Sequence, residues 1–342
     1  MSLSSSLPRV SLCDHLPTSL QEAPRLSKAL GIKLFVKRED LTGLATGGNK
    51  IRNLEFIFGE VLERGCDAII TTAGVHSNMC RATAATAARL GMKCMLLLRG
   101  SKGDPEEGNL LLDRLLGADV RFIPTKDPYD ERVPGWLEEA SRELEAAGHR
   151  PYVLHLTGGT STLATCAYVD GAEELAAQFA KIGTIPDSLY VTVGSGITMA
   201  GLVLGFKHLE RPTRVVGVSA NSEAGFLADR IVDYANSAAS RLRLDTRIVA
   251  GDFEVLDDYV GPGYGVPTPE AIEAIRLTAR EEGLLLDPVY TGKCMAALQD
   301  RARNGHLGQD ETVVFLHSGG IPNLFAQAGT LKTRAPLTQQ PR

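Results

Sequence analysis

Short apolar runs alternate with longer amphipathic segments along most of the chain, starting near residue 32. The runs have the length of buried strands, and the segments between them place their apolar residues on one helical face. This alternation predicts an α/β protein with mostly parallel sheets covered by helices on both faces, in which ligands bind at the C-terminal ends of strands. The predicted strands are residues 33–36, 68–71, 92–98, 120–123, 152–156, 188–193, 214–219 and 312–317, and the predicted helices are residues 51–64, 81–90, 109–116, 134–147, 171–182, 199–208 and 270–282.

The pattern becomes less regular after Ser222. A helical stretch continues to about Arg241, and a turn rich in glycine and proline at 261–269 precedes the last predicted helix. The sequence contains no obvious linker or internal repeat, so the pattern leaves the domain boundary open. The tail after Leu331 is rich in Pro, Gln and Thr and is predicted to fray.

Composition narrows the functional class. The 342 residues are 44% apolar, enough for two α/β lobes, and carry a formal charge of −5. Basic residues are scattered among acidic ones, which argues against nucleic acid or an anionic membrane as a partner. The N-terminus lacks a secretion signal, no segment approaches ~18 consecutive apolar residues, and the six cysteines are too far apart for a zinc or disulfide framework. We therefore expect a cytoplasmic protein with reduced thiols and no metal.

The densest chemical signal is the segment from residue 36 to Lys50, which reads VKREDLTG and then TGGNK. A strand ends there, and a lysine stands in the first turn of a helix, where the helix dipole disfavours a cation. Such a lysine is well placed as a neutral amine that attacks an aldehyde, and a solvated surface lysine is the alternative reading. The glycines before Lys50 are spaced as in a nucleotide-binding P-loop, but Asn49 stands between the last glycine and the lysine, and Ile51 occupies the position of the Ser or Thr that binds magnesium. The segment is therefore not expected to bind a nucleotide.

A second signal follows the apolar strand at 188–193. The residues after it are small or hydroxylated and open a helix: Gly194, Ser195, Gly196, Ile197 and Thr198. The main-chain N–H groups of such a turn, together with its two hydroxyls, suit a phosphate at a helix N-terminus, and a tight turn without a ligand is the alternative. The spacing does not fit the GxGxxG pattern, which disfavours an NAD-dependent dehydrogenase.

Three further segments end apolar runs in polar residues. The first contains His76, Ser77 and Asn78, which could grip a carboxylate, although Ser77 could act only as a helix cap. The other two read DPVYTGK from residue 287 and LHSGG from residue 316. Tyr290 is a candidate proton carrier, and a packed tyrosine is the simpler alternative.

Six motifs together resemble one family: GGNK at Lys50, Ser77-Asn78, GSGIT, GPGYG at 261–265, DPVYTGK and LHSGG. From about residue 16 to 328 the chain resembles the D-cysteine desulfhydrase and 1-aminocyclopropane-1-carboxylate deaminase family of pyridoxal-phosphate-dependent enzymes. The resemblance implies the tryptophan-synthase-β-like fold (fold type II), with two open, twisted sheets. It also implies a large domain of residues 1–51 and 164–342, a small domain of residues 52–163, and a homodimer.

The resemblance assigns roles to the residues of these motifs. Lys50 would bind pyridoxal 5'-phosphate as a Schiff base, Asn78 would contact its phenolic oxygen, and the 194–198 loop would hold its phosphate. The substrate would contact five side chains: His76, Ser77, Asn78, Tyr264 and Tyr290. The candidate catalytic groups are Lys50, Ser77 and Tyr290.

Thr291 separates the two activities of this family. Members that open the cyclopropane ring carry a glutamate there, which keeps the pyridine nitrogen protonated and the ring a strong electron sink. A threonine offers only a neutral hydrogen bond, so we expect α,β-elimination of D-cysteine to pyruvate, ammonia and sulfide.

Other activities stay open. His76 stands where relatives commonly have glutamine, and Met79-Cys80 are less polar than expected, so L-cysteate is an alternative substrate. A second alternative is deamination of 1-aminocyclopropane-1-carboxylate to 2-oxobutanoate. A third is a degenerate fold of this type that binds a ligand without turning it over.

Overall fold

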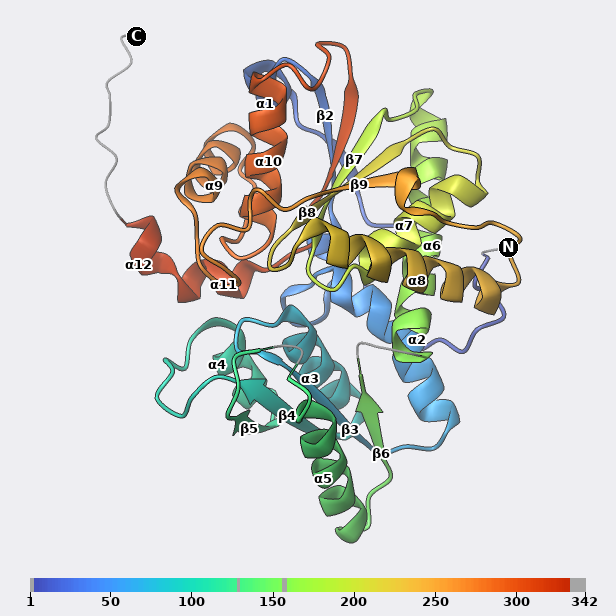
Figure 1. Cartoon of the computed structure of the whole chain (residues 1–342), viewed down its shortest axis with the longest axis vertical. Coiled ribbons are helices and arrows are strands. Elements are labelled where there is room, and N and C mark those ends of the chain that lie inside the picture. Colours follow the sequence, from blue (N-terminus) through green and yellow to red (C-terminus); the bar gives the residue numbers. More distant parts are fainter. Residues whose placement is uncertain (1–2, 128–129, 156–158, 333–342) are drawn as a thin grey trace.

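The computed structural model describes residues 3–127, 130–155 and 159–332. Two separate sheets organise these residues (Figure 1). The larger sheet has six strands in the order β1-β2-β10-β7-β8-β9, and the smaller has four in the order β5-β4-β3-β6. Within the described ranges, β1 and β2 pair antiparallel and all other neighbouring strands pair in parallel. The predicted fold class, with two mostly parallel sheets, is therefore confirmed.

Most of the predicted strands are present with small changes at their ends. Central strands such as β7 and β10 are buried along their whole length, which explains why they read as continuous apolar runs. The strands of the larger sheet are β1 (Leu20–Glu22), β2 (Lys33–Lys37), β7 (Ser188–Val193), β8 (Arg214–Ser219), β9 (Phe253–Leu256) and β10 (Thr312–Leu316), and those of the smaller sheet are β3 (Ala68–Gly74), β4 (Lys93–Arg99), β5 (Asp119–Ile123) and β6 (Pro151–Leu154).

Helices pack on both faces of each sheet. The larger sheet has α1, α9 and α10 on one face and α6, α7 and α8 on the other, and the smaller sheet lies between α5 and the pair α2 and α3. The helices are α1 (Pro24–Leu30), α2 (Asn49–Glu63), α3 (Asn78–Leu90), α4 (Gly108–Leu115), α5 (Val133–Ala146), α6 (Gly159–Ile182), α7 (Ile197–His208), α8 (Ala224–Leu242), α9 (Pro269–Glu282), α10 (Thr291–Arg303), α11 (Ile321–Ala326) and α12 (Ala328–Leu331).

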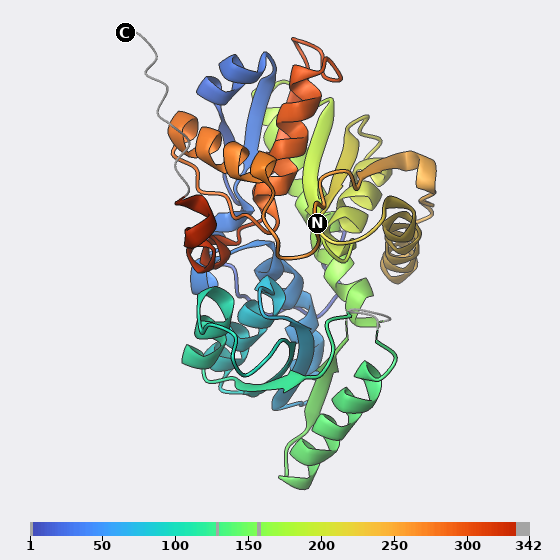
Figure 2. The ribbon, with the colours of Figure 1, turned by 60° about the vertical axis from the view of Figure 1, so that its left-hand side comes forward.

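Each sheet defines a lobe. We call the six-stranded sheet with α1 and α6 to α12 the large lobe, and the four-stranded sheet with α3 to α5 the small lobe. Helices α2 and α6 pack against each other where the lobes meet, and α11 lies beside α4 in both views (Figures 1 and 2). The lobes approach so closely there that a Cβ atom on Gly108 would lie 2.9 Å from the carbonyl oxygen of Pro322. The positions of the two sheets support the predicted domain boundaries, between residues 51 and 52 and between residues 163 and 164. These boundaries stay a proposal.

The structure also contains elements that the sequence pattern did not predict. Helix α6 begins at Gly159, well before the predicted start at 171. The sequence pattern missed its first half because that half is buried on nearly all sides and has no polar face. Helix α10 was missed because it buries polar Thr291, Lys293 and Gln299 beside its apolar residues. The strands β1 and β9 are too short to give a clear pattern. The tail predicted to fray lies mostly outside the described residues.

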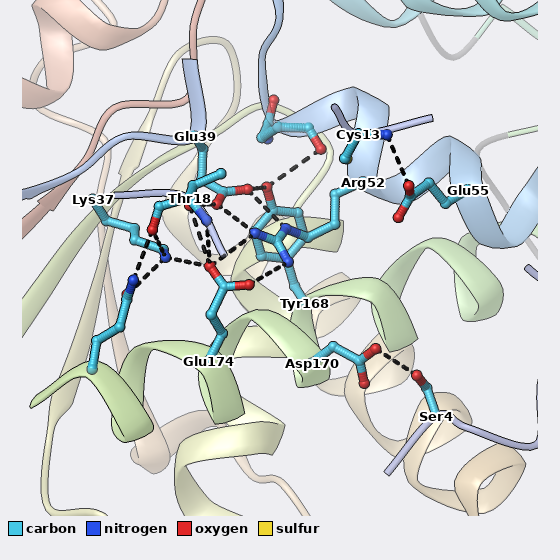
Figure 3. A network of polar contacts seen from close by, with 12 residues as sticks. Ser4, Cys13, Thr18, Lys37, Glu39, Arg52, Glu55, Tyr168, Asp170 and Glu174 are labelled. Carbon is cyan, nitrogen blue, oxygen red and sulfur yellow. Dashed lines mark hydrogen bonds and ion pairs between the residues drawn. The ribbon is translucent and has the colours of Figure 1, made fainter. Parts of the chain in front are cut away.

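A cluster of buried charges joins β2, α2 and α6 (Figure 3). The guanidinium of Arg52 donates two hydrogen bonds to Glu39, at 2.8 and 3.0 Å, and two to Glu174, at 3.1 and 3.2 Å. Glu39 also accepts hydrogen bonds from the hydroxyls of Thr18 and Tyr168, both at 2.6 Å. The carboxylate of Glu39 is therefore fully hydrogen-bonded, as a buried charge requires.

Arg52 determines the charge state of this cluster. Burial by itself raises the pKa of Glu39, but the charge and hydrogen bonds of Arg52 outweigh burial and hold that pKa at about 2. Glu39 is thus ionised at neutral pH. The charge pair fixes α2 against the end of β2 only as long as both partners are present.

We expect Glu39→Gln to lower the free energy of unfolding by about 3 kcal/mol, because it leaves Arg52 buried without its main counter-charge. Urea denaturation at pH 7 measures this loss. Because the pKa of Glu39 falls from its ordinary value of 4.5 to about 2 on folding, its contribution is complete above about pH 4.5 and disappears as the pH falls toward 2. The difference between wild type and variant should narrow over that range.

The matched control is Glu143→Gln, which removes an exposed carboxylate that accepts a hydrogen bond from Arg121 at 2.6 Å. An exposed pair of this kind contributes less than about 1 kcal/mol. Equal losses in the two variants would show that the buried cluster has no special role in stability.

Candidate active site

A cavity of about 360 Å³ lies between the two lobes and is lined by residues of both. Its walls contain the residues that follow β3, β7 and β10, so it lies at the C-terminal ends of the strands as expected for parallel sheets. The cavity brings together seven residues from the predicted site: Lys50, Ser77, Asn78, Gly194, Ser195, Tyr264 and Tyr290.

Lys50 is the second residue of α2, and its side chain is half-buried in the cavity wall. Gly48, which caps the helix, has a φ of 112°, and a Cβ there would lie 3.1 Å from the carbonyl oxygen of Ser318. The next N–H group, that of Asn49, donates to the same carbonyl at 3.0 Å. Burial lowers the pKa of Lys50 to about 8 from its ordinary value of 10.5, because the charged amine loses solvation.

The predicted phosphate loop lies next to Lys50. Gly194 and Ser195 line the cavity, and α7 begins at Ile197, so its first N–H groups have no acceptor within the helix. Thr198 does not line the cavity, but its hydroxyl accepts a hydrogen bond from the side-chain amide of Asn49 at 3.0 Å. This hydrogen bond from Asn49 therefore connects the start of α2 to the start of α7.

Ser77 and Asn78 come from the small lobe, at the start of α3. The hydroxyl oxygen of Ser77 accepts a hydrogen bond from the N–H of Cys80 at 3.2 Å, so Ser77 does cap helix α3. Because Ser77 also lines the cavity, its O–H remains available to a ligand. The cap and a ligand-binding role are therefore compatible.

Asn109 fixes the side chain of Asn78. The Nδ2 of Asn109 donates to Asn78 Oδ1 and to the carbonyl oxygen of His76, both at 2.9 Å, and it lies 3.3 Å from Asn323 Oδ1. The Nδ2 of Asn323 donates to the same His76 carbonyl at 3.2 Å. With its oxygen held in this way, Asn78 turns its own Nδ2 group away from Asn109, which makes it a donor to ligands in the cavity. Asn323 belongs to α11 of the large lobe, so this buried amide cluster also joins the two lobes.

Tyr264 and Tyr290 form a pair on the large-lobe side. Their hydroxyl oxygens lie 2.5 Å apart, and their rings meet edge to face with centroids 5.9 Å apart. Burial raises the pKa of Tyr264 to about 12 and raises the pKa of Tyr290 well above its ordinary value. Both hydroxyls therefore carry their protons at neutral pH, so each can donate a hydrogen bond and neither acts as a base in this state.

Thr291 and His76 lie behind the cavity wall and do not line it. The Thr291 hydroxyl donates to Asp287 Oδ1 at 2.7 Å and accepts from the N–H of Asp287 at 2.8 Å. The ring of His76 packs against the 261–265 loop, where a Cβ on Gly265 would meet it at 2.9 Å. Burial lowers the pKa of His76, so its ring is neutral at neutral pH.

Sequence reasoning missed several residues of the wall, among them Arg99, Asn221 and Ser318. Arg99 is the last residue of β4, and Asn221 follows β8. The rule that ligands bind where parallel strands end applies to both positions and could have found them. Ser318 was in a quoted motif, but nothing in its sequence context indicated a wall position.

Further findings bear on what the site can hold. Within residues 3–127, 130–155 and 159–332 no group of three metal-binding side chains comes together. In the same ranges, no helix is long and apolar enough to cross a membrane. All six cysteines are free.

Comparison with known proteins gives consistent matches over nearly the whole chain. Residues 14–319 match the profile of a family described as pyridoxal-phosphate dependent enzymes. A D-cysteine desulfhydrase of Salmonella choleraesuis is 39% identical over 315 residues, which is 91% of this chain and 93% of that protein. A Pyrococcus abyssi protein with the provisional name 1-aminocyclopropane-1-carboxylate deaminase is also 39% identical, over 94% of each chain. A crystal structure of an ACC deaminase homologue superposes with a TM-score of 0.87 at 36% identity, covering 96% of this chain and 97% of that one.

The low pKa of Lys50 predicts how fast the protein reacts with an aldehyde at different pH values. Only the neutral amine attacks, so the rate at which cofactor-free protein takes up pyridoxal phosphate should rise with pH and level off above an inflection near 8. The growth of the visible absorption band between pH 6.5 and 10 measures this rate. Nα-acetyl-lysine in the same buffers supplies the reference, and a protein rate that still rises steeply at pH 10, as the reference does, would contradict the prediction.

The amide cluster predicts a role for Asn109 at a distance from any ligand. Asn109→Ala frees the side chain of Asn78 to rotate, and loss of one oriented neutral hydrogen bond weakens binding by up to about tenfold. We therefore expect a several-fold higher Kd for pyridoxal phosphate, measured by absorption titration.

The control for this effect is Asn304→Ala, at an exposed asparagine whose side chain bonds only to Asp300 within the described structure. Asn304→Ala should bind the cofactor as wild type does. A wild-type Kd in Asn109→Ala would show that Asn78 needs no support from Asn109.

Proposed function

Because the chain belongs to the pyridoxal-phosphate-dependent enzymes, in the family of D-cysteine desulfhydrases and 1-aminocyclopropane-1-carboxylate deaminases, we propose that it eliminates sulfide from D-cysteine. The chain is a lyase that depends on this cofactor. The overall reaction converts D-cysteine and water to pyruvate, ammonia and hydrogen sulfide. The observation that carries the proposal is the half-buried Lys50 amine with its lowered pKa, in a cavity that both lobes line.

The cavity has the groups that pyridoxal phosphate needs. Lys50 supplies an amine for the aldehyde, and the first turn of α7 supplies N–H groups for the phosphate. The side-chain oxygen of Asn221 is buried in the wall with no hydrogen-bond partner among the described residues, which leaves a polar group for a ligand. When bound, the cofactor supplies a conjugated ring that withdraws electrons from the α-carbon of an amino acid.

The residues of this chain would divide the remaining work among them. Lys50 would hold the cofactor through its amine and, once free, would be the neutral base nearest the α-proton of the substrate. Ser77 and the N-terminus of α3 bind the substrate carboxylate. Tyr290, protonated and hydrogen-bonded to Tyr264, donates a proton to the departing sulfur.

Asp287 and Thr291 support elimination over opening of a cyclopropane ring. The carboxylate of Asp287 accepts hydrogen bonds from the N–H groups of Val289, Tyr290 and Thr291, and from the Thr291 hydroxyl. The carboxylate of Asp287 does not line the cavity, and Thr291 carries only a hydroxyl. A ring nitrogen would then receive no carboxylate partner from these two residues, which suffices for a substrate with an α-proton but weakens the electron sink that ring opening requires.

A product assay separates these activities. Holoenzyme is given D-cysteine, L-cysteate or 1-aminocyclopropane-1-carboxylate, and pyruvate, 2-oxobutanoate, sulfide and ammonia are measured. We expect pyruvate and sulfide from D-cysteine, with kcat/KM at least about tenfold above that for 1-aminocyclopropane-1-carboxylate.

Lys50→Ala is the control for this assay. It should lose the visible band and reduce kcat by several orders of magnitude, because the variant lacks the amine that binds the cofactor and moves the proton. Comparable turnover of D-cysteine and the cyclopropane substrate by wild type would overturn the assignment to elimination. A visible band that persists in Lys50→Ala would overturn the role of Lys50.

A further inference from the structure

The four residues that lead into α2 have a strained backbone. Their φ angles are all positive, at 42° for Ala45, 71° for Thr46, 65° for Gly47 and 112° for Gly48. Two of the four carry a side chain, and this left-handed region is costly for any residue with a Cβ atom. Such backbone persists only where its surroundings hold it. The segment 45–48 is therefore expected to depend on contacts from outside itself.

Arg81 of α3 provides these contacts. Its side chain is fully buried, and α3 packs against the turn at 44–46. Nη1 of Arg81 contacts the carbonyl oxygens of Ala45 and Gly47, the latter at 3.1 Å. The hydroxyl oxygen of Thr46 lies 2.7 Å from the same nitrogen, so its two hydrogens are shared among three oxygens of the strained segment. Because Nε and Nη2 have no hydrogen-bond partner among the described residues, the guanidinium bonds to this segment alone.

Main-chain groups enclose the segment 45–48 on its other sides. A Cβ on Gly47 would collide with the carbonyl oxygen of Asp40, and a Cβ on Gly319 would lie 2.8 Å from the Cα of Gly48. The guanidinium of Arg81 thus closes a narrow space in which the segment lies, and its Nη2 would be 3.6 Å from a Cβ on Gly48. Removal of the guanidinium would leave the strained segment room to relax toward α3.

Arg81 connects two parts of the candidate site without lining the cavity itself. Its own N–H lies 3.4 Å from the carbonyl oxygen of Ser77, one helical turn earlier at the start of α3. The segment that its guanidinium holds determines where α2 begins and thus where Lys50 stands. We propose that Arg81 is a positioning residue for Lys50, which keeps the Lys50 amine within reach of the aldehyde of bound pyridoxal phosphate. This inference rests on the proposed role of Lys50.

Arg81 acts on the place of the Lys50 amine and not on its charge. Burial is what lowers the pKa of Lys50, with no contribution from Arg81. In the reaction with the aldehyde, the neutral nitrogen attacks the carbonyl carbon, a C=N bond forms and one water molecule leaves, so no other reagent is needed. A reacting group displaced by about 1 Å can lose about a hundredfold in rate. Loss of the Arg81 guanidinium should therefore slow this step and have little effect on cofactor binding before it.

The test measures reaction and binding separately in the full-length, cofactor-free protein at about pH 9, where most of the Lys50 amine is neutral. The limiting rate at which the visible band grows, at saturating pyridoxal phosphate, reports the covalent step and does not depend on affinity. Calorimetry with pyridoxamine 5'-phosphate, which has an amine in place of the aldehyde, reports binding alone. We expect Arg81→Met to lower the limiting rate at least about tenfold and to leave the Kd for pyridoxamine 5'-phosphate near its wild-type value.

Two further variants distinguish support of strained backbone from simple packing. Glycine adopts a positive φ without penalty, so Ala45→Gly should raise the limiting rate of Arg81→Met at least about threefold, and no increase would contradict the proposal. Arg81→Lys keeps the charge with fewer donors and should lie between wild type and Arg81→Met. The matched control is Arg142→Met, at an exposed arginine of α5 that lies 3.9 Å from Glu138 and should leave both values unchanged.

A wild-type limiting rate in Arg81→Met would overturn the proposal. An equal loss of rate and of affinity for pyridoxamine 5'-phosphate would also exclude it, because that pattern indicates damage to α3 and not displacement of Lys50. If circular dichroism shows that Arg81→Met does not fold, Arg81→Lys replaces it, and support then requires a limiting rate at least about threefold below wild type that Ala45→Gly raises.

Failure of the proposed function has a different signature, which is wild type that forms no visible band with pyridoxal phosphate. The role of Lys50 is then wrong, and the role of Arg81 fails with it. A band in wild type that forms equally fast in the Arg81 variants removes the role of Arg81 alone and leaves that of Lys50 in place.

Discussion

The buried ion pair between Arg52 and Glu39 is the interaction on which the position of Lys50 depends. Arg52 follows Lys50 closely on α2, and its guanidinium is held by Glu39, in the turn that follows β2, and by Glu174 of α6. Tyr168 of α6 donates its hydroxyl hydrogen to Glu39 at 2.6 Å, and the same hydroxyl oxygen lies 3.3 Å from the carbonyl oxygen of Asn49. These contacts restrain the first turn of a helix, which otherwise frays, and so keep the amine of Lys50 at a fixed place in the cavity wall.

The two lobes contribute different kinds of group to the cavity. Lys50 stands at the start of α2, where the lobes meet, and the large lobe supplies the N-terminus of α7 and the tyrosine pair. The small lobe supplies the ends of β3 and β4 and the start of α3, with side chains that suit a carboxylate or another anion. The amide cluster of Asn109 and Asn323 joins the lobes beside this boundary. Helix α2 packs against both α6 and α3, so a relative movement of the lobes would alter the surroundings of Lys50 as well.

The sequence predicted the features that follow from local rules. Strand ends, small residues before a helix and a lysine in the first helical turn are visible in one dimension, and these features indicated Lys50, Ser77, Asn78 and the 194–198 loop. The first half of α6 and the whole of α10 were missed because burial on most sides removes the polar face from which a helix is recognised. Asn109 could not have been found in this way, since its partners Asn78 and Asn323 are brought together only by the packing of α4 against α3 and α11.

Thr291 and Asp287 lie behind the large-lobe side of the cavity and bond to each other rather than line it. In the elimination proposed above, neither would supply a carboxylate to a bound ring, which suits a substrate that has an α-proton to lose. Arg99, at the end of a small-lobe strand, lines the same cavity from the other lobe. Substrate identity therefore has to be argued from the small-lobe wall as well as from the residues around Lys50.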